Sequence, residues 1–152
     1  MRIAEALILR ADYQKKLEQL KQRLLRNAKV QEGEKPAENP RDLLEELEQV
    51  TRDLTGLVQR INRTNALTGL EDNSTVSDAL ARRDVLGLKH AFYRELAQAA
   101  TVTQDRYTKS EVKFKSTVDI PGLQKQADDL ARQYRELDMK IQETNWSKDL
   151  LE

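Results

Sequence analysis

The sequence contains no cysteine, which excludes a disulfide framework, thiolate chemistry and a cysteine-ligated metal. Lysine plus arginine and aspartate plus glutamate number 26 each, so no overall field attracts nucleic acid or an anionic membrane. No run of about 18 apolar residues occurs, which excludes a transmembrane helix. The short apolar run at the N-terminus is interrupted by Glu5 and makes a poor signal peptide. Together with the absence of cysteine, this leads us to expect a cytoplasmic protein.

Residues that break helices are scarce as well, with 5 glycines and 3 prolines among 152 residues, while 34% of the residues are charged. This composition is typical of long helices with a solvated outer face. We expect a single, mainly all-α domain over residues 1–152, in which four long helices form two antiparallel hairpins or a bundle. The predicted helices cover residues 2–28, 41–66, 76–103 and 121–147.

Two of the predicted helices, 41–66 and 121–147, carry an apolar seam that alternates four- and three-residue steps. This spacing is typical of left-handed coiled-coil packing. Both seams end in polar residues, because Arg60–Asn65 and Lys140–Asn145 each contain an isoleucine, a threonine and a final asparagine in the same register. In an up-down-up-down arrangement these two helices run parallel, so the polar endings would lie at one pole of the bundle.

Threonine and asparagine on a buried seam need a hydrogen-bonded network, a ligand or water, because an unpaired buried polar group costs about 1–3 kcal/mol. The alternative is structural: Asn65 and Asn145 end their helices, while Arg82 and Arg83 pair with nearby carboxylates. The candidate residues of this polar pole or interface are Arg60, Asn62, Arg63, Thr64, Asn65, Asp78, Arg82, Arg83, His90, Asn145 and Trp146.

The predicted helix 76–103 is apolar over an unusually wide arc. One apolar line contains Val85, Leu88, Phe92, Leu96 and Ala99, and a second line runs beside it. Such a helix is expected to pack on two sides, against neighbours in its own subunit and against another subunit. His90 falls within the second line and is the only histidine, so we expect a hydrogen-bonded core or interface residue rather than a metal ligand.

A small two-stranded β element is expected in the connections between helices, at residues 28–33 and 111–118. Val112, Phe114 and Val118 alternate with polar residues at the period of a strand. A lone strand is unstable in water, and the first connection offers a partner whose glutamates would face Lys113 and Lys115.

No pattern of catalytic residues is visible. The sequence lacks a glycine-rich phosphate loop, a nucleophile elbow and a His–Glu metal motif. We therefore expect a protein that is not an enzyme, with no cofactor, no catalytic or metal-binding residues and no identifiable small-molecule ligand.

Several motifs together resemble the septicolysin-like proteins of bacteria. They are Val30–Glu34 with Pro36 and Pro40, Arg60–Asn65, Asp78–Leu86 with His90, Arg135–Asp138, and Ile141–Trp146. The resemblance spans nearly the whole chain and implies a small, mostly helical homo-oligomer, with a hexameric ring as one arrangement. It implies no catalytic residues. The oxygen-labile pore-forming activity that named the family is not carried over, because this chain has no cysteine.

Three functions remain open at this point. The first is a non-enzymatic, self-assembling helical protein that acts as a structural or interaction module, with copies of itself as partner. The second is a pore-forming or membrane-active assembly of the septicolysin type. The third is a nucleic-acid-binding ring that gathers Arg60, Arg63, Arg82 and Arg83 around its axis, although the balanced net charge disfavours it.

Overall fold

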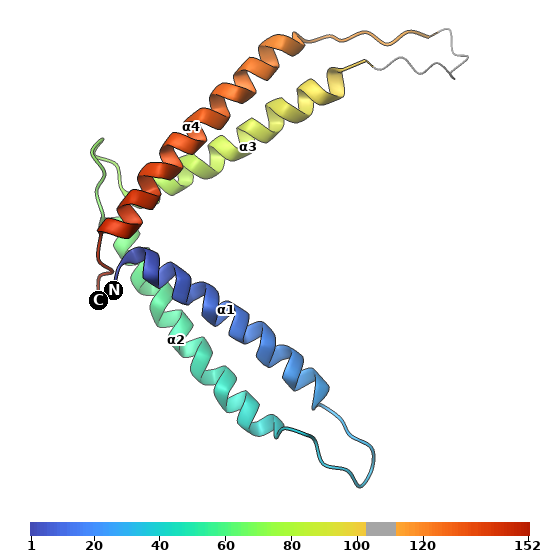
Figure 1. Cartoon of the computed structure of the whole chain (residues 1–152), viewed down its shortest axis with the longest axis vertical. Coiled ribbons are helices and arrows are strands. Elements are labelled where there is room, and N and C mark those ends of the chain that lie inside the picture. The colour runs from blue at the N-terminus through green and yellow to red at the C-terminus, as the bar shows by residue number, and fades with distance from the viewer. Residues whose placement is uncertain (103–111) are drawn as a thin grey trace. The chain divides into compact units, whose positions relative to one another are not determined.

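The computed structural model of the protein describes residues 1–102 and 112–152, and within them it contains four α-helices (Figure 1). They are α1 (Ile3–Arg26), α2 (Pro40–Leu67), α3 (Val76–Ala100) and α4 (Ile120–Ser147). These bounds lie close to the four predicted helical ranges. The helices form two compact units, and each is described by itself: Met1–Thr75 with Gln142–Glu152, and Val76–Ile141. The single domain over residues 1–152 stays a prediction.

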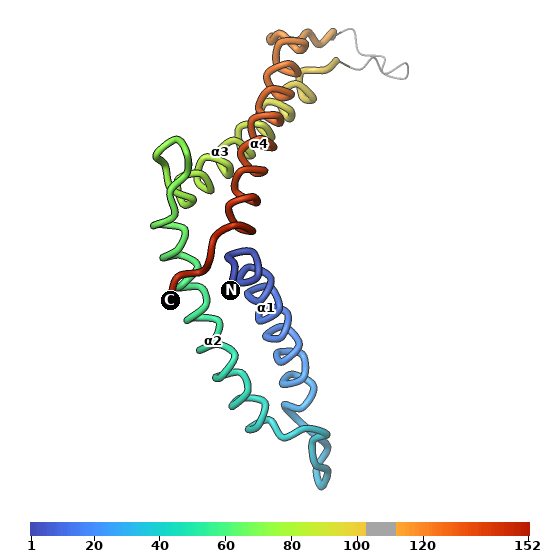
Figure 2. Tube along the Cα trace, turned by 60° about the vertical axis from the view of Figure 1, so that its left-hand side comes forward, coloured from blue at the N-terminus to red at the C-terminus, as the bar shows by residue number. Residues whose placement is uncertain are grey.

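In the first unit, α1 and α2 form a helical hairpin whose members lie side by side in both views (Figures 1 and 2). One core cluster contains Leu20, Leu43 and Val50, and a second contains Ala6, Leu57, Ile61 and Leu150. Tyr13 packs against both clusters, so the core continues along the hairpin. The buried residues of α2 are those of its predicted seam, which places the seam against α1.

Polar contacts close the loop between α1 and α2. The guanidinium of Arg23 donates hydrogen bonds to both carboxylate oxygens of Glu38, and Asn27 accepts from the Glu38 backbone N–H at 3.0 Å. The bond from Arg23 holds the pKa of the Glu38 carboxyl below its ordinary value. Asn39 then caps α2 by accepting from the N–H of Arg41 at 3.0 Å, with Pro40 in the first helical position.

The predicted two-stranded β element is wrong. Residues 28–33 lie in the loop closed by Glu38 and contain a turn, in which Gly33 has a left-handed φ of 88° and Glu34 N–H donates to the Gln31 carbonyl. Residues 112–118 have no strand either, and residue 111 lies outside the described residues. The described ranges contain only isolated backbone bridges, Arg2 to Asp149 and Gly69 to Thr75. Local turn and cap hydrogen bonds replace the pairing that we expected.

In the second unit, α3 and the part of α4 up to residue 141 form another hairpin (Figure 1). The side of α3 that packs on α4 combines small residues with the buried Val76 and the partly buried Leu86 and Tyr93. Ala79 and Ala97 are buried, and a Cβ added at Gly87 would lie 3.3 Å from a ring carbon of Tyr134. An ion pair of 2.7 Å between Arg83 and Asp138 also joins the two helices. The small side chains let the two helices approach closely where Gly87 meets Tyr134.

Candidate functional site

The polar end of α2 binds the C-terminal segment of the chain. Thr64 is 1% exposed, and its hydroxyl donates to the Arg60 carbonyl at 2.7 Å and accepts from the Leu151 backbone N–H at 3.0 Å. Arg60 Nε donates to the Leu151 carbonyl at 3.1 Å, and Arg63 donates to the Glu152 carbonyl at 2.8 Å. Thr64, Arg60 and Arg63 are therefore hydrogen-bonded to backbone groups of the same unit.

The same segment is held along its other edge by the start of the chain. Ile3 N–H donates to the Lys148 carbonyl at 3.0 Å, and Leu150 N–H donates to the Met1 carbonyl at 2.8 Å. Leu150 is buried in the core cluster of Leu57 and Ile61. The two chain ends accordingly lie together in both views (Figures 1 and 2). This arrangement is a structural lock, and no sequence motif in residues 148–152 predicted it.

The remaining candidates of the first unit differ in burial. Asn145 is buried, whereas Asn62 is exposed and Trp146 is 58% exposed. The side-chain oxygen of Asn65 is buried and has no hydrogen-bond partner among the described residues. The structure thus brings Thr64 and two arginines together with the C-terminal segment, while Asn62 and Trp146 remain on the surface.

Four predicted candidates, Asp78, Arg82, Arg83 and His90, belong to the second unit instead. Asp78 and Arg82 are exposed, and Arg83 is used in the ion pair with Asp138. The predicted candidates therefore fall into two sets, one in each unit.

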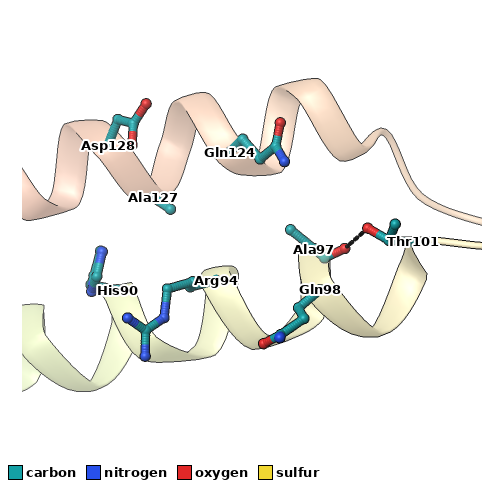
Figure 3. A pocket seen from close by; sticks show the side chains of 8 residues that line it. All are labelled: His90, Arg94, Ala97, Gln98, Thr101, Gln124, Ala127 and Asp128. Atoms are coloured by element: carbon teal, nitrogen blue, oxygen red, sulfur yellow. Dashed lines mark hydrogen bonds between the residues drawn. The ribbon is translucent and has the colours of Figure 1, made fainter.

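His90 lines an open groove of about 670 Å³ between α3 and α4 (Figure 3). Small side chains of Ala97 and Ala127 form part of its lining, and Arg94, Gln98, Thr101, Gln124 and Asp128 complete it. In Figure 3 the imidazole of His90 points toward α4, whereas the guanidinium of Arg94 points away from it. The groups have mixed charge and do not converge on one point, so the groove shows no selectivity for a ligand class.

The side of α3 that faces away from α4 carries large apolar side chains that are exposed to solvent. Val85, Leu88, Phe92 and Leu96 are 61%, 71%, 70% and 38% exposed. These four residues recur at three- and four-residue steps and therefore form one continuous line, here called the outer stripe of α3. With about 3.6 residues per turn, the stripe lies on the side of α3 opposite Ala79 and Ala97. The sequence predicted this line of residues but did not show which of the two apolar lines faces α4.

The exposed face of α4 is different. It carries charged side chains, among them Lys125, Arg132, Arg135 and Glu136. Its exposed large apolar residues in this unit are Tyr134 and Met139, which form no line along the helix. A charged helix face is the ordinary solvated surface of a hairpin. The outer stripe of α3 is therefore a specific departure from a solvated surface, and we take it as the candidate functional site.

The described ranges contain neither a cluster of metal-ligating side chains nor a helix suited to a bilayer. In residues 1–102 and 112–152, no three histidine or carboxylate side chains gather closely enough to hold a metal ion. Among the helices of this part of the chain, none combines the length and the apolar character that crossing a bilayer requires.

Comparison with known proteins gives a family without an assigned activity. The chain is similar to a solved structure from Corynebacterium diphtheriae, described as a functionally unknown conserved protein, with 46% identity and a TM-score of 0.94 over 99% of each chain. No curated protein matches significantly. The model of a family of unknown function, DUF6847, matches residues 10–150, and the chain therefore belongs to that family.

Proposed function

We propose that this protein is a non-enzymatic, self-assembling helical protein that acts as a structural or interaction module in the cytoplasm. The observation that carries the proposal is the outer stripe of α3, in which Leu88 and Phe92 are more than two-thirds exposed. Fully burying a side chain of this type contributes about 1.5–3 kcal/mol. The stripe would thus supply a substantial driving force for association with a partner.

The size of the exposed stripe supports an interaction role. Its four side chains leave about 400 Å² of apolar surface exposed, which is comparable to the largest patch on an ordinary monomer, and such patches are often functional. The neighbouring face of α4 is mostly charged, and its exposed Tyr134 and Met139 form no continuous line. A contact between the outer stripe and a partner explains why this face of α3 is apolar while the exposed face of α4 is mostly charged.

The nucleic-acid alternative has less support from the geometry. Arg60 and Arg63 donate to backbone carbonyls of the C-terminal segment, and Arg83 pairs with Asp138. Three of the four arginines that the ring hypothesis requires are therefore engaged within the chain. The membrane-active alternative shares the apolar stripe with the leading proposal, so the tests below must separate the two.

The first test is the mass of the full chain by light scattering at micromolar concentration. We expect a mass above that of one chain, and a mass of six chains would agree with the hexameric ring implied by the septicolysin-like resemblance. The variant Leu88→Ser should lower this mass, because it removes an exposed apolar side chain from the stripe. Leu25→Ser is the matched control, since Leu25 is a leucine of similar exposure, 62%, on α1. A monomeric wild-type protein would refute the proposal.

Release of dye from anionic vesicles tests the membrane-active alternative. We expect no release above the level of a buffer control. If the wild type and Leu25→Ser release dye but Leu88→Ser does not, the outer stripe contacts membranes, and the membrane-active alternative replaces the proposal.

A further inference from the structure

We infer that the outer stripe of α3 packs against the same stripe of a second copy of this chain, with the two α3 helices parallel and Asp84 of each copy facing Lys89 of the other. This inference rests on the proposed function and names the surface, the partner and the orientation. It is carried by the spacing of the stripe, the charges along its two edges, and its area.

The spacing of the stripe is that of a coiled-coil seam. From Val85 the apolar positions step by three to Leu88 and by four to Phe92, and Ala99 lies one heptad after Phe92. Ala81 lies one heptad before Leu88 and is also exposed, so the seam extends toward the start of the helix. The seam position one heptad after Leu88 is occupied by Glu95, and Leu96 lies beside it. Knobs-into-holes packing of two such helices would therefore centre on Val85, Leu88 and Phe92.

The two edges of the stripe have opposite charge. On a helical wheel Arg82 and Lys89 flank one edge and Asp84 flanks the other, whereas Glu95 occupies the seam position one heptad after Leu88. All four are exposed, and the Asp84 side chain is 73% exposed.

The charges distinguish the two possible orientations. In a parallel symmetric pair, each edge faces the opposite edge of the partner, so basic meets acidic; Asp84 and Lys89 occupy the flanking positions that pair across a parallel coiled coil. In an antiparallel pair, basic would face basic and acidic would face acidic, which disfavours association. The charge pattern therefore selects the parallel pair.

The area of the stripe sets the expected strength. Two copies would bury about 800 Å² of stripe side chains, and the flanking residues bring the contact toward the lower end of specific interfaces, about 1,200 Å². We therefore expect reversible association that depends on concentration in the micromolar range. A membrane surface is a poorer occupant, because an interfacial helix carries basic residues along both edges of its apolar face, whereas one edge here is acidic.

Cysteine cross-linking tests the orientation directly, because the chain has no cysteine of its own. Ala81→Cys and Ala99→Cys each change a small exposed residue at one end of the seam. In a parallel symmetric pair both positions meet their own copies, so each variant alone should form a disulfide-linked dimer under mild oxidation. In an antiparallel pair at most one of them can do so, because they lie 18 residues apart along the helix. Leu25→Cys on α1 is the control and should stay monomeric on a non-reducing gel.

A charge-reversal cycle tests the proposed ion pair. Asp84→Lys and Lys89→Asp should each raise the dissociation constant several-fold, since each places like charges across the interface, and the double variant should restore most of the affinity. Tighter association of the Asp84→Lys variant would indicate the antiparallel pair and overturn the inference.

The outcomes separate this inference from the proposed function. A wild-type chain that is monomeric overturns both. An oligomer that is insensitive to Leu88→Ser, or one in which Ala81→Cys and Ala99→Cys do not both cross-link, keeps self-assembly and overturns the parallel α3 pair. Circular dichroism and hydrogen exchange of each variant show whether α3 is still folded. If Leu88→Ser unfolds α3, Leu88→Gln takes its place. A Leu88→Gln variant that keeps α3 folded and has the oligomeric mass of the wild type overturns the inference.

Discussion

The substitution Thr64→Val tests whether the polar end of α2 locks the C-terminal segment. Valine has nearly the shape of threonine and the same branched Cβ, so the change removes the hydroxyl with little effect on volume or on rotamer freedom. The hydroxyl of Thr64 donates to the Arg60 carbonyl and accepts from the Leu151 N–H, and Thr64 is 1% exposed. The perturbation is thus confined to these two hydrogen bonds.

The expected loss comes mainly from the Leu151 N–H. The Arg60 carbonyl still serves as an acceptor within the helix, whereas the N–H of Leu151 loses the acceptor that the structure gives it. A part-buried donor left without a partner costs about 1–3 kcal/mol. The segment can escape this cost only by detaching, but Leu150 would then leave the core, which costs about 1.5–3 kcal/mol. We therefore expect a decrease of about 1–2 kcal/mol in the free energy of unfolding, or about 2–8 °C in Tm.

Thr55→Val is the matched control for this substitution. Thr55 makes the same type of hydrogen bond along α2, to the Thr51 carbonyl at 2.8 Å, but it is exposed and binds no other segment. Urea unfolding followed by circular dichroism should show a clear loss for Thr64→Val and a change within about 0.5 kcal/mol for Thr55→Val. Hydrogen exchange at the Leu151 amide should accelerate in the first variant alone. Equal stability of the two variants, with unchanged exchange at Leu151, would refute the lock.

Two further predictions concern the α1–α2 hairpin. Leu20→Ala should destabilise the protein by about 2–5 kcal/mol, because Leu20 is fully buried against Leu43 and Val50, whereas Leu25→Ala should change the stability by less than about 0.5 kcal/mol; thermal melts of both variants provide the comparison. The carboxyl of Glu38 has a lowered pKa in the folded chain, so its contribution to stability is present at neutral pH and is lost as the pH falls through that lowered value. Glu38→Gln should therefore be less stable than the wild type at neutral pH, and this difference should shrink in strongly acidic solution. A difference independent of pH would contradict the assignment.

The helices were predictable because their signal is local and repeated. Leu43, Val50, Leu57 and Ile61 follow one another at steps of seven, seven and four residues, and all four are buried in the structure. Repetition over many turns outweighs errors at single positions, which is why the four helical ranges agree closely with the structure. The β element failed for the opposite reason. A few alternating residues near Phe114 matched a strand period, whereas the first connection was already closed by hydrogen bonds from its own helix ends.

The lock at Thr64 was predictable only in part. A threonine on a buried seam requires a hydrogen-bond partner, and this requirement follows from the sequence. The partner is the backbone N–H of Leu151, 87 positions along the chain. Every residue except proline has a backbone N–H, so the sequence does not indicate which one pairs with Thr64. Leu150 and Leu151 form a small apolar pair near the end of the sequence, which is the one signal that could have pointed to a docked segment.

The sequence pattern alone did not show which apolar face of α3 packs on α4. Both apolar lines of this helix are equally plausible as core by pattern alone. The structure places Ala79, Gly87 and Ala97 on the side that packs on α4, and leaves Leu88 and Phe92 exposed. The packed side also holds Val76, Leu86 and Tyr93, which are buried or partly buried. The outer stripe nevertheless keeps four large apolar side chains exposed in one continuous line, and such a line argues for α3 as the place where copies of the protein meet.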